Sequence, residues 1–434
     1  MTTGVGASLP FCAPAAPAGL TLISRTRPLA PGEVGDLLHA LGPAGFAWLC
    51  DGAGFVTAGV AARLEVAPGP ARFARAAAEV AALLGSIETN DHVHLPGTGP
   101  IAAGALPFDH RVPGQLVVPA LVVGRDATGA GWVTHTGPPG EILAAADEKG
   151  RGGPSADPVG PDGGFEVWER PSRWAWTAAV RRALAAIEAG ELRKVVLARE
   201  VVLEAAAPFD RARILDRLRR SHPSCFTYAA GGFVGASPEL LVRRRGVEVF
   251  SCPMAGTVPR GGTAEEDERL AAELRASAKE AEEHRLLVDA VLAALAPACA
   301  EPPGAAPAEI VRLATVSHLA TRVSGRLRSP APSALALAGL LHPTPAVGGL
   351  PRAPALRAIT ELEDFHRGLY AGPVGWVDAA GEGEWAVALR GAELDGLRAR
   401  LVAGAGIVAG SDPDAEWAET EAKLRPMLAA VGAA

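Results

Sequence analysis

Short runs of alternating apolar and polar residues fill much of the chain, and longer runs with helical spacing lie between them. Alternation favours half-buried strands, whereas apolar residues three and four apart favour helices. Strands in adjacent pairs are predicted at 45–49 with 54–59, and at 369–377 with 384–393. Further elements are predicted as strands at 101–107, 115–123, 131–135, 192–199, 240–249 and 400–408, and as helices at 70–84, 172–188, 332–341 and 414–430. Paired strands that seldom alternate with helices predict an α+β fold with antiparallel sheets rather than a doubly wound parallel sheet.

The same pattern divides the chain into two parts. Residues 1–160 are predicted to form a β-rich N-terminal lobe with few helices and no candidate functional residues. Residues 152–164 are rich in Gly, Pro and Asp without an apolar period, which predicts an exposed loop. This loop connects either two lobes of one domain or two domains. Residues 165–430 contain the remaining elements and the candidate site.

Composition narrows the class of protein. The 434 residues are 49% hydrophobic and 21% charged, which is enough for a sizeable core. The net charge is −7, with 5% aromatic residues and no basic stripe, so nucleic acid is not expected as a partner. Five cysteines without metal-ligand spacing predict reduced thiols in a cytoplasmic protein. No leader-like segment and no apolar run of about 18 residues is found, so no membrane span is expected.

Residues 237–284 bring three kinds of chemical group into one stretch. A turn holds the carboxylate Glu239, a Gly/Pro-rich loop is predicted at 253–262, and a long charged helix carries Glu283. This combination suits a small anionic substrate that is handled by acid chemistry and a hard metal.

Two residues are candidates for proton transfer. Lys194 lies in an apolar strand, where it either extends its ammonium to water or loses enough solvation to act as a general base. Glu239 is either a surface acid or a catalytic acid, whose pKa would be raised by apolar neighbours such as Leu240 and Phe233.

The other candidates also have ordinary alternatives. Gly256 and Thr257 lie in the predicted loop, which is either a plain turn or an anion site built from backbone N–H groups. His342, at a helix end, favours a cap or a core hydrogen bond, and Arg390 is either a carboxylate fork or an edge charge. Carboxylates and a lysine lie on two helices, at Glu283, Glu416, Glu419 and Lys423. They form either solvated faces with a Glu–Lys pair worth about 0.2–0.5 kcal/mol, or a Mg²⁺ site shared between helices.

Taken together, these stretches resemble the chorismate-utilising enzymes, which include isochorismate, salicylate, anthranilate and aminodeoxychorismate synthases. The matching runs keep the family's order and spacing from Lys194 to Lys423. They are KVVLAR (194–199), GASPELL (235–241), PMAGTVPRG (253–261), SAKEAEEH (277–284), HPTPAVGG (342–349), ELEDFHRGLYAGPVGW (361–376), GEWAVALRGAEL (383–394) and AGAGIVAGSDPDAEWAETEAK (403–423). One departure is Glu280, where the family more often has aspartate.

Within this family, Lys194 resembles the members that add water, which have lysine at this position, whereas the members that use ammonia typically have glutamine there. HPTPA and GEW resemble the isochorismate synthases, which are isomerases (hydroxymutases) of siderophore, menaquinone or salicylate-type metabolism. The alternatives are a salicylate synthase, which would also eliminate pyruvate, and a non-catalytic chorismate-binding homologue. An anthranilate-type subunit with a glutaminase partner is disfavoured by Lys194, and a cytoplasmic monomer is expected.

The resemblance also implies a fold and a site. The fold would be one large α+β domain of two packed, mainly antiparallel sheets with helices outside, and 165–430 would be its chorismate-binding catalytic region. Lys194 would activate water at C2 of chorismate, and Glu239 would protonate the departing C4 hydroxyl. Mg²⁺ would be held by Glu283, Glu416 and Glu419. The implied substrate-binding residues are Gly256, Thr257, His342, Ala346, Arg390, Gly404 and Lys423.

Overall fold

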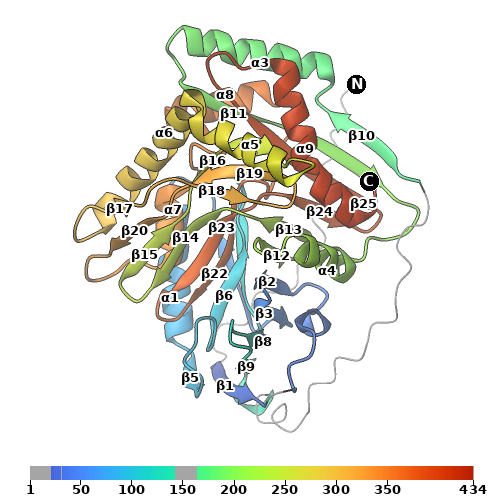
Figure 1. The fold of residues 1–434 in the computed structure, drawn as a ribbon. Helices are drawn as coiled ribbons and strands as arrows, with labels where there is room; N and C mark the ends of the chain where they lie inside the picture. The colour runs from blue at the N-terminus through green and yellow to red at the C-terminus, as the bar shows by residue number, and fades with distance from the viewer. Residues whose placement is uncertain (1–20, 31, 142–163, 434) are drawn as a thin grey trace, which may run out of the picture.

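A computed structural model describes residues 21–30, 32–141 and 164–433, and its strands form two large sheets and one small sheet (Figure 1). Along the larger, 13-stranded sheet the order is β10 (Glu166–Arg170), β11 (Lys194–Glu204), β25 (Arg398–Ile407), β24 (Gly391–Asp395), β13 (Phe233–Ser237), β12 (Phe226–Ala230), β2 (Phe46–Cys50), β3 (Ala53–Ala58), β8 (Leu121–Arg125), β9 (Gly131–Gly137), β1 (Ile23–Leu29) and β5 (Glu88–Asp91), and β21 (Gly349–Leu350) also pairs with β11.

The second sheet has nine strands. Their order is β17 (Gly304–Ala305), β20 (Val323–Arg326), β15 (Glu248–Ser251), β14 (Leu240–Arg245), β23 (Gly383–Val387), β22 (Pro373–Asp378), β6 (Ile101–Ala105), β7 (Gly114–Val118) and β4 (Ala62–Val66). A small third sheet, which was not predicted, contains β16 (Met254–Pro259), β19 (Val316–Ala320) and β18 (Glu309–Arg312).

Helices cover the sheets from outside (Figure 1). They are α1 (Arg72–Gly85), α3 (Arg173–Glu188), α4 (Arg211–Ser221), α5 (Ala264–Ala276), α6 (Ala278–Leu295), α7 (Ala334–Leu341), α8 (Arg352–Leu362) and α9 (Pro413–Val431), with 3₁₀ turns at Leu37–Ala40 and Ala296–Ala298. Among the described strands, every pairing except that of β1 with β5 is antiparallel. The predicted α+β class, with mainly antiparallel sheets in one domain, is confirmed.

Strands from the two parts of the chain pair with each other in both large sheets. In the larger sheet β2 pairs with β12, and in the second sheet β6 pairs with β22. The boundary predicted near residue 160, and nearly all of the predicted loop at 152–164, lie outside the described residues. That division of the chain stays a prediction.

Two predicted strands are each a pair of strands in the structure. The strand predicted at 115–123 is wrong because Pro119, which has no N–H for the ladder, separates β7 from β8. The strand predicted at 240–249 is also wrong. There Gly246 has a φ of 55° and makes the left-handed turn that folds β14 back onto β15.

Three further predictions near the site need correction. The strand predicted at 384–393 is broken between β23 and β24, where Arg390 has a φ of 51°. The loop predicted at 253–262 is mostly strand β16, because β19 supplies a pairing partner that is distant in the sequence. The long charged helix is two helices, since Ser277 ends α5 and its hydroxyl caps α6 at the N–H of Glu280.

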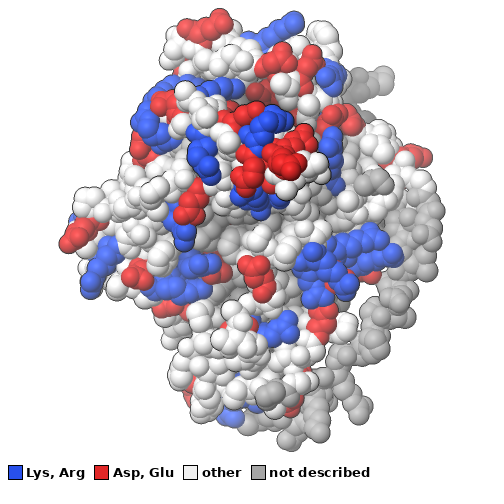
Figure 2. Space-filling view, viewed as in Figure 1, with Lys and Arg blue, Asp and Glu red and all other residues white. Residues whose placement is uncertain are grey.

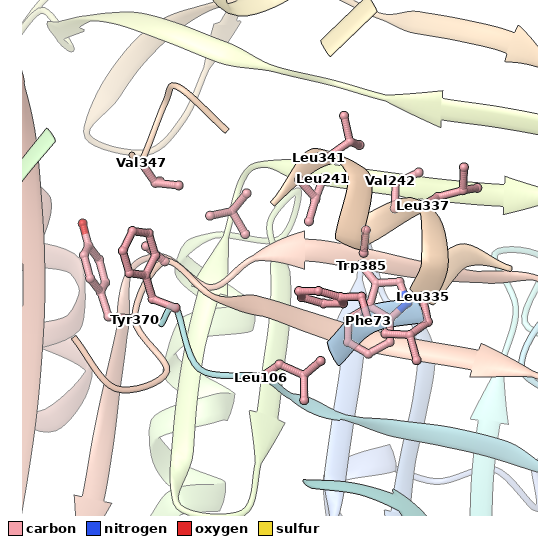
Figure 3. Packing of buried hydrophobic residues seen from close by; sticks show 14 of the residues in the cluster. Phe73, Leu106, Leu241, Val242, Leu335, Leu337, Leu341, Val347, Tyr370 and Trp385 are labelled. Carbon is pink, nitrogen blue, oxygen red and sulfur yellow. The ribbon is translucent and has the colours of Figure 1, made fainter. Parts of the chain in front are cut away.

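The largest core cluster packs α1 and α7 against the second sheet. Figure 3 shows Phe73 of α1 close to Leu335 of α7 and Trp385 of β23. Leu335 and Trp385 are fully buried, and burial of each such side chain contributes about 1.5–3 kcal/mol. The two helices are in close contact, because a Cβ on Gly339 would lie 2.4 Å from Phe73 Cβ. This packing holds β14 and β23 of the second sheet, and the connections outside these strands contain Glu239 and Arg390.

Charged side chains are unevenly distributed on the surface (Figure 2). Lys and Arg gather over α4, whereas acidic and basic side chains are mixed over α5. Arg219 of α4 pairs with Asp216, and Arg217 donates to the carbonyl oxygen of Ala430 in α9. Arg219 also pairs with Asp36, so Arg217 and Arg219 help to hold α4 against its neighbours. Within the described residues, no helix is both long and apolar enough to span a membrane.

Candidate active site

A cavity lies where the chain passes between the two large sheets. β13 of the larger sheet continues into β14 of the second through Pro238 and Glu239, and β23 returns to β24 through residues 388–390. Because β13 pairs with β24 and β14 pairs with β23, the two crossovers lie side by side. Glu239 and Arg390 therefore line the same cavity.

Glu239 is held by its backbone and surrounded by protein. Its N–H donates to the hydroxyl of Ser237 at 3.3 Å, and its carbonyl oxygen accepts from the N–H of Val387 at 3.1 Å. Burial raises the pKa of Glu239 to about 8, although Lys194 and other nearby cations lower it. The carboxyl group is therefore protonated at neutral pH, which is the state required of a general acid.

Arg390 lines the cavity, and its guanidinium is free to bind a ligand. Its positive φ turns the chain between β23 and β24, a conformation that is uncommon for a residue other than glycine. Burial lowers the pKa of Arg390, yet a guanidinium retains its charge at neutral pH. Among the described residues, no side chain or carbonyl group accepts a hydrogen bond from this guanidinium. A carboxylate of a ligand could therefore take up its donors.

Lys194 begins β11 and reaches across the cavity to α6. Its ammonium lies 2.7 Å from Glu283 Oε1, and only 7% of the side chain is exposed. Gly406 of the neighbouring strand β25 makes room for it, because a Cβ there would lie 2.9 Å from Lys194 Cε and 3.4 Å from its Nζ. The absence of a side chain at Gly406 of β25 therefore allows the Lys194 side chain of β11 to extend along this route.

Strand β16 contributes a backbone wall. Its pairing with β19 shifts by one residue at Gly256, which bulges out with a φ of 72°. His318 of β19 donates from Nδ1 to the carbonyl oxygen of Gly256 at 2.9 Å, and Thr257 Oγ1 lies 3.1 Å from the same nitrogen. Burial lowers the pKa of His318 to about 4, so the ring is neutral at pH 7.

Helix α9 supplies a second Lys–Glu pair. Lys423 donates to the carbonyl oxygen of Gly404 at 2.9 Å and pairs with Glu419, one turn earlier in the helix. Burial opposes the charge of Glu419, but Lys423 offsets it, and the pKa of Glu419 is lowered overall. Both Glu419 and Lys423 line the cavity.

The carboxylates of α6 and α9 form an acidic group that would suit a hard cation. Burial and the nearby charge of Glu283 raise the pKa of Glu280, and Glu419 adds to this effect. Burial raises the pKa of Glu416 to about 7, and the charge of Glu419 contributes. Within the described residues, no three His, Cys, Asp or Glu side chains form a ready-made metal cluster. Mg²⁺ usually takes only one or two protein carboxylates and completes its shell with water and substrate oxygens, so this set fits it.

The structure brings ten of the twelve predicted site residues together around one cavity. They are Lys194, Glu239, Gly256, Thr257, Glu283, Ala346, Arg390, Gly404, Glu419 and Lys423. Glu416 is buried just behind the lining, where its Oε1 accepts from Ser411 Oγ at 2.7 Å.

His342 does not line this cavity, so the structure gives no support to its predicted contact with a substrate. Its Nε2 lies 3.0 Å from the carbonyl oxygen of Phe108, and its ring packs between Phe73 and Phe108. Burial lowers the pKa of His342 to about 3, so the ring is neutral. It is a core residue at the end of α7, as the alternative interpretation of the sequence stated.

Two polar residues of the cavity were not predicted. His318 follows Ser317 in strand β19, and no local pattern marked it as a site residue. Tyr370 lies within a matching run but was assigned no role, and its hydroxyl lies against the backbone of Gly404. Burial raises the pKa of Tyr370 to about 12, so its hydroxyl stays protonated.

Known proteins resemble this chain in sequence. Isochorismate synthase DhbC of Bacillus subtilis (strain 168) is 38% identical over 344 residues, which cover 77% of this chain and 81% of that protein. A putative isochorismate synthase MenF of Mycobacterium tuberculosis (strain H37Rv) is 42% identical over 349 residues, which cover 77% of this chain and 87% of that protein.

Solved structures resemble it over nearly the whole length. A putative 2,3-dihydroxybenzoate-specific isochorismate synthase, DhbC from Bacillus anthracis, has a TM-score of 0.77 and 31% identity, and the match covers 92% of this chain and 99% of that chain. The menaquinone-specific isochorismate synthase MenF from Escherichia coli has a TM-score of 0.80 and 28% identity, with 94% of this chain and 95% of that chain covered. The family model described as chorismate binding enzyme matches residues 161–432. This chain therefore belongs to the chorismate binding enzyme family.

Proposed function

We propose that this protein is an isochorismate synthase, which converts chorismate to isochorismate by adding water at C2 with loss of the C4 hydroxyl. The observation that carries the proposal is the placement of Lys194 and Glu239 in one cavity, where burial raises the pKa of Glu239 to about 8. Similarity to several isochorismate synthases supports the same reaction.

The charges of the cavity suit chorismate, which is a dianion. Arg390 and Lys423 contribute two positive charges, and the proposed Mg²⁺ would offset the carboxylates of Glu283 and Glu419. Arg390 would bind a substrate carboxylate as a fork. Gly256, Thr257, Gly404 and Lys423 would bind the remaining carboxylate and enolpyruvyl oxygens, with Ala346 against the substrate.

The two proton-transfer residues have opposite tasks. Lys194 would remove a proton from the water that attacks C2, and Glu239 would give its proton to the C4 hydroxyl as it leaves, while the ring double bonds shift between them. Atoms balance, because one water is taken up and one is released. Lys194 must be neutral for this task, and it is now paired with Glu283. A cation held by Glu283 would compete with Lys194 for this carboxylate.

We propose Mg²⁺ as the cofactor, held by Glu283 and Glu419, with Glu416 nearby. When bound, it would offset the charge of the substrate's ring carboxylate. We also propose a cytoplasmic monomer that works without a glutaminase subunit. Lys194 supports the absence of ammonia chemistry, and the free thiols of Cys50, Cys225 and Cys252 suit a reducing compartment.

The test is to incubate the purified protein with chorismate, in Mg²⁺ or in EDTA, and to separate the products. The expected result is isochorismate that forms only with Mg²⁺ and without pyruvate. Equal amounts of salicylate and pyruvate would instead identify a salicylate synthase. Bound chorismate without turnover would identify a non-catalytic binding protein.

A further inference from the structure

Strand β11, which carries Lys194, has a gap along one edge. β25 pairs with it continuously from Val195 to Glu204. On the opposite edge β21 pairs only with Lys194 and Val195, and β10 pairs only from Glu200 onwards. Residues 196–199 therefore have no neighbouring strand on that side among the described residues, although their backbone groups are buried and need partners.

Two charged side chains fill most of this gap. Arg367 Nη2 donates to the carbonyl oxygen of Val196 at 2.8 Å, and the N–H of Ala198 donates to Glu363 Oε1 at 2.9 Å. Arg367 Nη1 also donates to the carbonyl oxygen of Val347 at 2.7 Å. One ion pair thus joins β11 to the segment that follows α7.

The pair is fully enclosed by protein. The exposed fractions of the Arg367 and Glu363 side chains are 3% and 4%, and the guanidinium donates to both carboxylate oxygens of Glu363. Burial opposes the charge of Arg367, but Glu363 offsets it, and the pKa of Arg367 is raised overall. The guanidinium also lies 4.5 Å from the ring centroid of Phe108. Such a pair is costly to desolvate, so stability alone is weak grounds for its presence.

The groups that the pair holds belong to the wall of the cavity. Val196 and Val347 both line it, and Lys194 lies two residues before Val196 in the same strand. The N–H of Tyr370, another lining residue, donates to the carbonyl oxygen of Arg367 at 3.1 Å. Val347 and Tyr370 lie at the same end of the core cluster in Figure 3. Neither Arg367 nor Glu363 lines the cavity, so neither would touch the substrate.

We infer that Arg367 and Glu363 form a positioning pair, which fixes Lys194 and the adjacent cavity wall relative to the substrate. This inference rests on the proposed function. The ordinary alternative is that the pair only completes the edge of the sheet. A misplacement of about 1 Å at a reacting group can cost about 10²-fold in rate, whereas loss of an edge contact lowers stability alone.

The test compares conservative variants of the pair with a matched control. Arg367→Lys keeps the charge but cannot bond Val196, Val347 and both oxygens of Glu363 together. Glu363→Gln keeps an acceptor for Ala198 but removes the charge. The control is Arg400→Lys, since Arg400 pairs at 2.6 Å with Glu200 of β11, also donates to the carbonyl oxygen of His366, and does not itself line the cavity.

Two quantities are measured on the full chain: steady-state kinetics with chorismate and Mg²⁺, and amide hydrogen exchange of residues 195–199 and 345–349. For Arg367→Lys and Glu363→Gln we expect kcat at saturating chorismate to fall by about tenfold or more, with a much smaller change in KM. Exchange in both segments should become faster. Arg400→Lys should leave kcat within about twofold of the unaltered chain, whatever its thermal midpoint.

The inference is overturned if both pair variants keep kcat within about twofold, even when exchange is faster, because the pair is then structural only. Glu363→Gln decides the outcome should Arg367→Lys not fold. Failure of the proposed function is recognised separately, because the unaltered chain would then form no isochorismate. In that case the proposed function fails, and unchanged exchange in both variants would also overturn the positioning.

Discussion

The two sides of the cavity hold their charges in different ways. On the sheet side, Glu239 and Arg390 sit at adjacent crossovers, with no ion pair between them or to another described residue, and Glu239 is protonated. On the helix side, carboxylates are paired with lysines, as Glu283 is with Lys194. On the sheet side, Glu239 can therefore give up a proton and Arg390 can bind an anion. On the helix side, the lysines offset the charges of the glutamates until a cation or a substrate displaces them.

This difference follows from how each side is built. Crossovers between buried strands put single side chains into a dry space, where burial favours the neutral form of an acid. The first two turns of α6 and α9 instead place acids three residues apart, at Glu280 and Glu283 and at Glu416 and Glu419, so that like charges lie close together. Activity should therefore depend on the single proton of Glu239 on the sheet side, and on a bound cation on the helix side.

The largest expected effect is loss of proton transfer. Lys194→Ala and Glu239→Gln should each lower kcat by about 10²–10⁴-fold, the usual contribution of a general acid or base. Isochorismate formation is measured by product separation, and circular dichroism verifies the fold. Glu282→Gln, an exposed acid beside Glu283, is the matched control and should retain full activity. Activity close to that of the unaltered chain in either variant would remove that residue from the mechanism.

The next effect concerns the cation. Glu283→Gln and Glu419→Gln should each raise the Mg²⁺ concentration needed for half-maximal activity by about 10–100-fold or more, since even residues that only support metal ligands have effects of this size. The measurement is a Mg²⁺ titration of activity at fixed chorismate. An unchanged titration curve in both variants would show that these carboxylates do not hold the metal.

A smaller effect is expected from crowding Lys194. Gly406→Ala adds a methyl group 2.9 Å from Lys194 Cε, so the ammonium must move, and kcat should fall by about tenfold. Gly85→Ala adds the same group in α1 with no atom within 4 Å, and its activity should not change. Equal kcat values for the two variants would contradict the path assigned to the lysine.

The smallest effect is expected at an ion pair away from the cavity. Arg269 and Glu273 on α5 are more than half exposed and lie 2.6 Å apart. Arg269→Ala should change the free energy of unfolding by about 0.2–0.5 kcal/mol and leave kcat unchanged. Urea unfolding measures the first quantity. A fall in kcat as large as that of a cavity variant would contradict the view that exposed ion pairs matter less than enclosed ones.

Much of the site was predictable because its residues lie at changes in local pattern. Lys194 interrupts an apolar strand, and Glu239 follows a proline turn, so each stands out within its own segment. The acids of α6 and α9 have regular helical spacing that shows they share a face. That these segments meet at one cavity came from the resemblance rather than from the pattern.

What could not be predicted depends on partners distant in the sequence. Residues 253–262 look like a loop because of their Gly and Pro content, and only pairing with β19 makes them a strand. The break at Arg390 has no glycine to mark it, since it is imposed by the crossover between sheets. His342 matched a motif, but tertiary packing buries it against Phe108 instead of the cavity.

The protonation state of Glu239 tests the central claim most directly. Infrared difference spectra between the unaltered chain and Glu239→Gln, recorded from pH 5 to 10, would isolate this carboxyl group. Because its pKa is raised to about 8, a protonated carboxyl band should persist at pH 7 and disappear around pH 8, and kcat/KM should fall over the same range. A carboxylate already ionised at pH 6 would contradict the assignment of Glu239 as the neutral acid of the sheet side.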